Sequence, residues 1–104
     1  MKFSFVKSFC LALFISMLTI AAPALAGDAA AGKSSSAACG ACHGPEGVSV
    51  NPMWPNLAGQ QEMYLAKQMK DFRDGNRKDP VMAPMAAALS DEDIANLAAY
   101  YSGL

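Results

Sequence analysis

The residues with the clearest chemical potential form the segment Cys39-Gly40-Ala41-Cys42-His43. This C-x-x-C-H spacing is the attachment signature of c-type haem. Two thiols three residues apart lie close together on one helical turn, so each can add to one vinyl group of the haem. The histidine that follows directly can ligate the iron of the tethered ring. The segment therefore predicts one covalent haem c, with Cys39 and Cys42 as its thioether attachment points and His43 as an axial iron ligand.

Three other uses of a cysteine pair are weaker interpretations. A structural zinc site takes four ligands, and outside the signature residues 27–104 contain no further cysteine or histidine. A thioredoxin-like dithiol needs a βαβ context, which the sequence does not suggest. A lone disulfide differs from the multi-cysteine framework of small secreted proteins. Zinc, a redox dithiol and a disulfide stay open as minor alternatives to haem.

The iron needs a second axial ligand or keeps an open site. Because the chain has a single histidine, the candidate ligands are the thioethers of Met53, Met63, Met69, Met82 and Met85. Met82 and Met85 lie downstream on a segment that prolines restrict, where a thioether could reach the haem face opposite the histidine. Met63 and Met69 fall in a predicted helix, where methionine usually fills the core. Composition alone does not choose between Met82 and Met85.

The first 26 residues have the features of a secretory signal peptide. They contain Lys2 and Lys7, an apolar run over 9–20 and a small-x-small site at 24–26. The apolar run is shorter than the roughly 20 residues that a transmembrane span needs. We expect residues 1–26 to be cleaved, leaving a periplasmic domain of residues 27–104. An uncleaved N-terminal anchor is the alternative.

The composition of the predicted mature domain limits both its partners and its core. Residues 27–104 carry six basic and nine acidic side chains, a net charge of −3. A nucleic-acid-binding domain is usually basic, so this class is disfavoured. Few large aliphatic residues are present, and small chains of this kind usually depend on a disulfide, a metal or a cofactor. We expect the haem to complete the core, in a cavity lined by Leu57, Tyr64, Leu65 and Leu97.

Helical periodicity dominates the rest of the chain. An alanine-rich stretch predicts a helix over 28–38, and apolar residues at helical spacing predict a second over 60–72. The third predicted helix opens at Ser90, where Ser90 and Asp93 resemble a capping box. No segment alternates as a strand does, so the predicted fold class is all-α. The predicted buried faces consist of Leu65, Met69 and Phe72 in the second helix and Ile94, Leu97, Ala98 and Tyr101 in the third.

Two long connections separate these three main helices. The first covers 44–59 and is rich in glycine and proline, and the second covers 77–84 with two further prolines. Long loops are uncommon in a small domain unless they serve a site. We therefore expect both loops to wrap around the bound ligand.

Several segments extend the pattern beyond the haem attachment signature. They are Pro55-Asn56-Leu57-Ala58-Gly59-Gln60, Tyr64-Leu65-Ala66-Lys67-Gln68, Asp71-Phe72-Arg73-Asp74-Gly75, Met82-Ala83-Pro84-Met85, and Leu89-Ser90-Asp91-Glu92-Asp93-Ile94 with Ala98-Ala99-Tyr100-Tyr101. With these segments, nearly all of residues 27–104 resemble a class I cytochrome c of the small periplasmic mono-haem type. The chain is also similar to one half of the tandem di-haem bacterial cytochromes c.

The resemblance implies the cytochrome c fold and assigns roles to individual residues. In such proteins the ligand methionine precedes the serine that caps the last helix by eight residues, which selects Met82, with Met85 as the runner-up. The carbonyl of Pro55 would accept a hydrogen bond from Nδ1–H of His43, and this bond fixes the tautomer and orientation of the ring. Gly32 would allow the first and last helices to cross closely, near the paired tyrosines.

The function implied is that of a periplasmic one-electron carrier, not an enzyme. His/Met ligation raises the haem potential and occupies both faces of the iron, which disfavours substrate chemistry there. The expected partners are redox proteins, either a membrane respiratory complex or a periplasmic reductase or oxidase, in weak and transient contact. No nucleic acid and no stable membrane anchor are expected. Two alternatives stay open: a haem-bearing subunit of a larger oxidoreductase complex, and a ligand-binding haem protein with a displaceable methionine.

Overall fold

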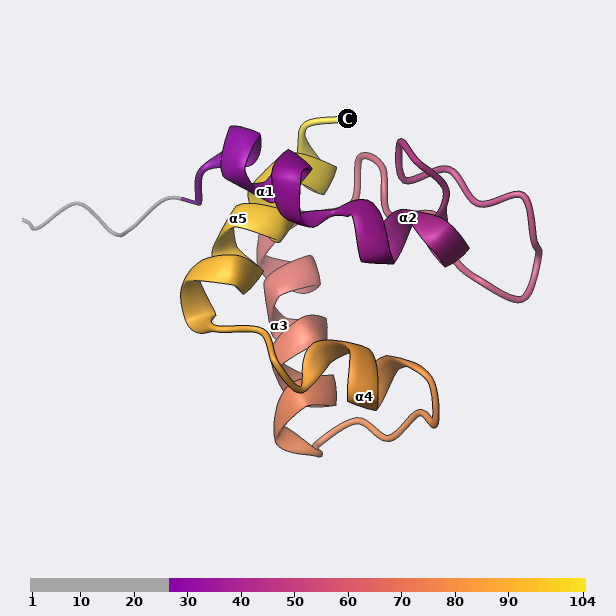
Figure 1. Ribbon diagram of the computed structural model, residues 1–104, viewed down its shortest axis with the longest axis vertical. Helices are drawn as coiled ribbons and strands as arrows, with labels where there is room; N and C mark the ends of the chain where they lie inside the picture. Colours follow the sequence, from indigo (N-terminus) through magenta and orange to yellow (C-terminus); the bar gives the residue numbers. More distant parts are fainter. Residues whose placement is uncertain (1–26) are drawn as a thin grey trace, which may run out of the picture.

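The computed structural model describes residues 27–104, so the predicted signal peptide lies outside the described residues. The helices of this part are α1 (Ala29–Ser35), α2 (Ala37–His43), α3 (Glu62–Asp74), α4 (Met82–Ala86) and α5 (Asp91–Ser102). Residues 27–104 contain no strand. Helix α5 packs against both α1 and α3, α4 packs against α3, and the connection after α2 extends away from the helices (Figure 1). The prediction of an all-α cytochrome c fold is confirmed.

Helix α5 is the centre of the core and begins where the sequence predicts. The Ser90 hydroxyl accepts a hydrogen bond from the Asp93 N–H at 3.0 Å, and the Asp93 carboxylate accepts one from the Ser90 N–H at 2.9 Å. These reciprocal bonds satisfy donors that the first helical turn leaves free. The predicted apolar face is almost completely buried, with exposed fractions of 0 to 2% for Ile94, Leu97, Ala98 and Tyr101.

Helices α1 and α5 cross in direct backbone contact at Gly32. A Cβ atom on Gly32 would lie 2.0 Å from the carbonyl oxygen of Asn96 and 2.9 Å from Cβ of Tyr100. Only a residue without a side chain fits this space. Asp28 adds one polar link to α5, because its N–H donates to Oδ1 of Asn96 at 2.7 Å, while its carboxylate caps α1 itself. The predicted close crossing is therefore present.

The prediction of a single helix over 28–38 is wrong. The helix ends at Ser35, the chain turns at Ser36, and α2 continues separately to His43. The buried Ser36 hydroxyl donates to the carbonyl of Lys33 at 2.7 Å, and its own N–H also bonds to that carbonyl at 3.2 Å. Serine side chains compete with helical hydrogen bonds in this way. The break allows the haem attachment segment to form a short helix of its own.

Helix α3 packs on α5 through the predicted face. Leu65 and Phe72 are buried, and Met69 packs partly buried against the core. Met63 is 86% exposed, so the interpretation of Met63 as a core residue is wrong. It lies two residues from Leu65, which places it about 200° around the helix and therefore on the opposite face.

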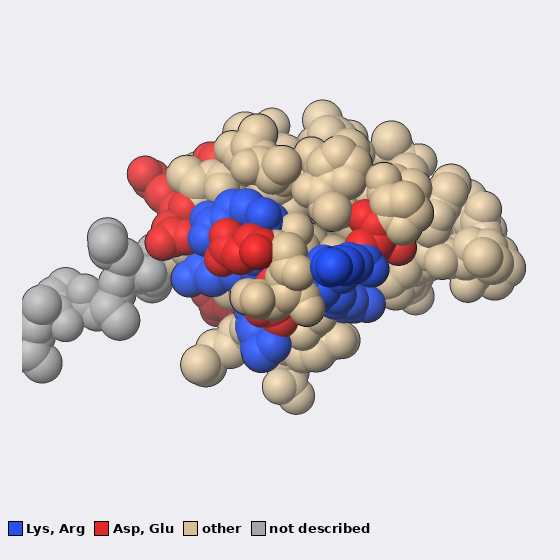
Figure 2. Space-filling model, turned by 90° about the horizontal axis from the view of Figure 1, so that it is seen from below, with Lys and Arg blue, Asp and Glu red and all other residues tan. Residues whose placement is uncertain are grey.

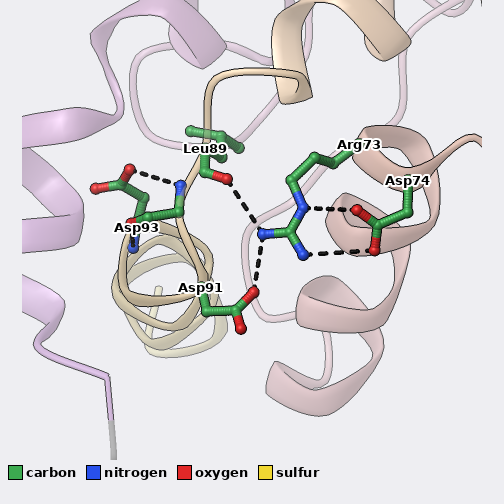
Figure 3. A network of polar contacts seen from close by, with 6 residues as sticks. Arg73, Asp74, Leu89, Asp91 and Asp93 are labelled. Atoms are coloured by element: carbon green, nitrogen blue, oxygen red, sulfur yellow. Dashed lines mark hydrogen bonds and ion pairs between the residues drawn. The ribbon is translucent and has the colours of Figure 1, made fainter.

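Arg73 ties α3 to the start of α5 (Figure 3). Its guanidinium donates from Nη1 to the carbonyl of Leu89 at 3.2 Å and to Oδ1 of Asp91 at 2.8 Å, and from Nε to Oδ1 of Asp74 at 2.9 Å. Asp74 and then Asp91 raise the pKa of Arg73, since both carboxylates stabilise its charged form. The network holds the connection between α4 and α5 against α3.

Charged side chains are unevenly distributed over residues 27–104. Five of the six basic residues lie within 67–78, and no charged residue occurs within 47–61. On the face shown in Figure 2, Lys and Arg lie interleaved with Asp and Glu. The end of the molecule that holds the connection after α2 shows uncharged residues there, drawn in tan. No helix in the described residues is both long enough and apolar enough to span a membrane.

Candidate functional site

Helix α2 places the three residues of the haem attachment signature together. Cys39 and Cys42 are free, half-buried thiols. His43 is the last residue of the helix, and only 7% of its surface is exposed. Gly44 follows with φ of 87°, and a Cβ at this position would lie 1.9 Å from the carbonyl oxygen of Val48. The chain can therefore turn back over the imidazole only because residue 44 is glycine.

The imidazole of His43 is oriented by one backbone carbonyl. Its Nδ1 lies 2.7 Å from the carbonyl oxygen of Pro55. A carbonyl oxygen can only accept, so Nδ1 carries the proton and Nε2 keeps its lone pair. The structure thus brings His43 and Pro55 together as the resemblance implied, and it leaves Nε2 available as a metal ligand.

The connection that carries Pro55 is folded back on itself by its own hydrogen bonds. The Gly47 carbonyl accepts from the N–H groups of Leu57 at 2.8 Å and Ala58 at 3.0 Å. Oδ1 of Asn56 accepts from the N–H of Ser49 at 2.7 Å. These bonds fix the backbone on both sides of Pro55, so its carbonyl is held in place for the histidine.

Tyr101 closes the cysteine side of the site, a role that the sequence does not predict. Its hydroxyl is buried beside Cys39 and has no hydrogen-bond partner among the described residues. Burial raises the pKa of Tyr101, and burial likewise raises the pKa of the Cys39 thiol. The Tyr101 carbonyl accepts from the N–H of Gly59 at 2.9 Å, which attaches the connection after α2 to α5. The periodicity of α5 predicts that Tyr101 is buried, but it does not predict that Tyr101 lies beside Cys39.

The cavity expected from the sequence is only partly supported. Leu65 and Leu97 are buried in the helical core, so they do not line an open space. Leu57 packs partly buried against that core, and Tyr64 is 48% exposed. The apolar faces of α3 and α5 pack against each other, so among these four residues only Leu57 and Tyr64 keep exposed surface that a cofactor could contact.

Both candidate methionines lie on α4, not on the loop that the sequence predicts. Met82 is its first residue and is half-buried, whereas Met85 is 45% exposed. Pro84 falls in the first turn of α4, where a missing N–H costs no helical hydrogen bond. The proline that indicated a loop is therefore compatible with a short helix.

Asp79 anchors the start of this helix. Its Oδ1 accepts from the N–H of Met82 at 2.8 Å and from the N–H of Val81 at 2.9 Å. These two N–H groups, Met82's above all, hold the pKa of Asp79 below its usual range. No prediction from the sequence named this residue, although an Asp followed by a Pro is a common signal for the turn before a helix.

The donor set fits a covalent haem better than a bare metal ion. In the described part of the chain, no three His, Cys, Asp or Glu side chains are grouped so that they could hold an ion. The two thiols and the imidazole of α2 therefore do not converge on one point, as structural zinc would require. A haem needs separate attachment points for its edge and its iron, and α2 offers two thiols and one imidazole with a free Nε2.

Comparison with known proteins agrees with this chemistry. The family model described as Cytochrome c matches residues 29–104. The chain belongs to the cytochrome c family. Membership in this family implies a covalently bound haem c and a role in electron transfer. The predictions of a cytochrome c domain, of its haem c and of electron transfer are therefore confirmed.

Individual relatives place this cytochrome among small and tandem proteins. It is 54% identical over 80 residues to cytochrome c-554(548) of Halomonas halodenitrificans, covering 74% of this chain and 96% of that one. It is 53% identical over 77 residues to cytochrome c4 of Pseudomonas aeruginosa, covering 74% of this chain and 38% of that one. A crystal structure of reduced recombinant cytochrome c4 from Pseudomonas stutzeri matches with a TM-score of 0.71 and 46% identity, over 74% of this chain and 45% of that one.

The lengths covered differ between these relatives. The chain spans nearly all of the Halomonas cytochrome but less than half of either cytochrome c4, so it corresponds to one half of the tandem protein. A protein of Stutzerimonas stutzeri named thiosulfate dehydrogenase electron acceptor is 42% identical over 69 residues, which cover 64% of this chain and 32% of that one.

Proposed function

We propose that this cytochrome is a one-electron carrier of the periplasm whose haem iron is held by His43 and Met82. Residues 1–26 would direct export and be removed, and residues 27–104 would form the working domain. The haem, when bound, supplies the Fe(II)/Fe(III) couple. The observation that carries the proposal is the pairing of an oriented imidazole on α2 with a half-buried, backbone-anchored methionine on α4.

The side chains and backbone groups around the haem have distinct tasks in this proposal. Cys39 and Cys42 would tether the ring edge, so that the ring stays in place through repeated oxidation and reduction. The Pro55 carbonyl holds Nδ1–H of His43 and makes Nε2 a better donor. The thioether of Met82 is a soft, neutral ligand that favours Fe(II) and raises the potential. With both faces of the ring closed by His43 and Met82, these side chains would leave no position on the iron for a substrate, so the bound haem would serve electron exchange only.

Met82 is favoured over Met85 by two features of α4. The Met82 side chain is more buried than that of Met85, and its backbone N–H is fixed by a carboxylate at 2.8 Å. The Met85 N–H makes only a longer bond, 3.4 Å, to the carbonyl of Val81. A ligand that must keep its place against thermal motion needs the firmer anchor.

The Met82→Ala variant tests this ligand assignment, with Met85→Ala as its matched control from the same helix. We expect Met82→Ala to abolish the weak near-infrared sulfur-to-iron absorption band of the oxidised protein and to lower the midpoint potential. We expect Met85→Ala to keep the band. Loss of the band in Met85→Ala with its retention in Met82→Ala would reverse the assignment.

The partners would be redox proteins in transient contact. The relative named thiosulfate dehydrogenase electron acceptor supports an oxidoreductase as the electron donor of this chain, which is the class of partner we propose. A solved thiosulfate dehydrogenase (TsdBA) from Marichromatium purpuratum, 35% identical over 73% of this chain and 18% of that one, supports a second candidate, a haem-bearing unit held permanently within an oxidoreductase. Sedimentation of the purified protein separates the two, because a transient carrier stays monomeric whereas a permanent subunit that has lost its partner self-associates through its exposed apolar interface.

A further inference from the structure

We propose that Asp79 is the positioning residue that keeps Met82 on the haem iron. The inference rests on the proposed His43/Met82 ligation and adds a residue that acts through the ligand's own backbone. Asp79 would not touch the iron or the ring. Its role would be to hold the first turn before α4 in the one conformation that delivers the Met82 side chain.

The geometry at Asp79 is that of a hydrogen-bonded turn, built over a proline, that leads directly into α4. Its Oδ1 accepts from two consecutive N–H groups, those of Val81 at 2.9 Å and Met82 at 2.8 Å, and its carbonyl accepts from Ala83 at 3.1 Å. Pro80 between them has a restricted φ and no N–H to satisfy. Three successive backbone donors thus converge on one residue, and the middle one belongs to Met82.

Asp79 is itself held against α3 by the residues before it. The Arg77 N–H donates to the carbonyl of Asp71 at 3.0 Å, its Nη1 donates to Oε1 of Gln68 at 2.6 Å, and its guanidinium lies 4.5 Å from the centre of the Phe72 ring. The path from rigid helix to ligand therefore runs from α3 through Arg77 and Asp79 to Met82. No residue of 75–81 is buried, so packing does not provide this support.

The chain offers a matched control for the loss of such an acceptor. Asp93 also accepts from a backbone N–H, that of Ser90 at 2.9 Å, but it caps α5 and has no contact with α4. Removing either carboxylate removes an acceptor of backbone N–H groups at the start of a helix. Only the removal of Asp79 frees the N–H of Met82, so the two variants separate a positioning effect from general destabilisation.

The experiment uses the mature holoprotein and measures how fast added imidazole replaces the methionine on the oxidised iron, followed by the near-infrared band. We expect Asp79→Ala to speed the replacement roughly three- to tenfold, in line with the usual effect of losing a side-chain acceptor at the start of a helix. Asp79→Asn keeps an acceptor oxygen and should react at close to the wild-type rate. Asp79→Glu keeps the charge but displaces the oxygens, and should behave like Asp79→Ala.

Asp93→Ala should lower the unfolding temperature and leave the replacement rate unchanged. A wild-type rate in both Asp79→Ala and Asp79→Glu would overturn the inference, as would an equal acceleration in Asp93→Ala. Met82→Ala separates the ligand assignment of Met82 from the positioning role of Asp79. If Met82→Ala keeps the band, the ligand assignment fails and the inference falls with it. If Met82→Ala loses the band while the Asp79 variants react normally, only the inference fails.

Discussion

The α1–α5 crossing and the connection between α3 and α4 hold their residues by different means. At the crossing, the two helix backbones touch at Gly32, and α5 buries Ile94, Leu97 and Ala98 almost completely. In the connection, residues 75–81 contribute no buried side chain and depend on single hydrogen bonds. The first region is fixed by shape and the second by a few directional contacts.

This difference indicates a division of labour within a small domain. The packed crossing provides stability, because burial of apolar area is the largest favourable contribution to folding. The connection positions Met82, the proposed ligand, and each of its bonds contributes little to stability. Damage to the crossing should therefore lower the unfolding temperature with little change at the iron, and damage to the connection should do the reverse.

The largest expected effect comes from removing the haem, which would show whether the crossing is stable alone. The double variant Cys39→Ala/Cys42→Ala cannot form thioethers, and the core of so small a chain is insufficient without its cofactor. We expect loss of the whole folding free energy, about 5 to 15 kcal/mol for ordinary domains. Circular dichroism should show no cooperative thermal transition. A haem-free variant that melts cooperatively would show that the helices need no cofactor.

The second effect comes from Gly32→Ala, which disturbs the crossing alone. The new Cβ would meet the Asn96 carbonyl at 2.0 Å, so the helices must separate, at a cost of about 3 kcal/mol, the upper end for overpacked cores. Gly103→Ala is the control, since its Cβ would have its nearest neighbour at 3.5 Å. Calorimetry should show a lower melting temperature for Gly32→Ala only. A lost near-infrared band in the folded Gly32→Ala protein would mean that the two regions are coupled.

Features fixed by packing could be predicted from the sequence better than features fixed by a few hydrogen bonds. Periodicity identified the buried face of α5, and the capping pattern identified the Ser90–Asp93 box, because these depend on repeated spacing or on residues close in sequence. The crossing at Gly32 was expected only from the resemblance to class I cytochromes c, since it joins residues far apart in the chain. The break at Ser36 and the helix at Met82 were missed. Both are decided by side-chain hydrogen bonds, of Ser36 and of Asp79, that compete with backbone propensity, and residue spacing does not reveal which of these bonds form.

The candidate site shows the same contrast. Cys39, Cys42 and His43 are adjacent in sequence, so their motif alone identifies them. The hydrogen bond from His43 to Pro55 spans twelve residues of chain and was expected only from the resemblance to class I cytochromes c. The neighbour relation between Tyr101 and Cys39 joins two helices, and no local pattern predicts it.

The smallest expected effect concerns acid stability and the cap of α5. The Ser90 N–H holds the pKa of Asp93 below its usual range of about 3.9. The stabilisation is therefore present above that value and is lost as the pH falls through the lowered, folded-state pKa of Asp93. We expect Asp93→Asn to flatten the decline of melting temperature below about pH 4. An unchanged acid slope would mean that the cap contributes nothing through its charge.

His43 and Met82 are proposed to occupy both faces of the iron in a protein that carries electrons. Carbon monoxide binds reduced haem iron that has an open or easily displaced position, so it tests this claim directly on the unmodified holoprotein. We predict that the visible spectrum of the dithionite-reduced protein at neutral pH is unchanged under carbon monoxide. A rapid, complete shift to the carbon monoxide complex would contradict the account and identify a ligand-binding haem protein.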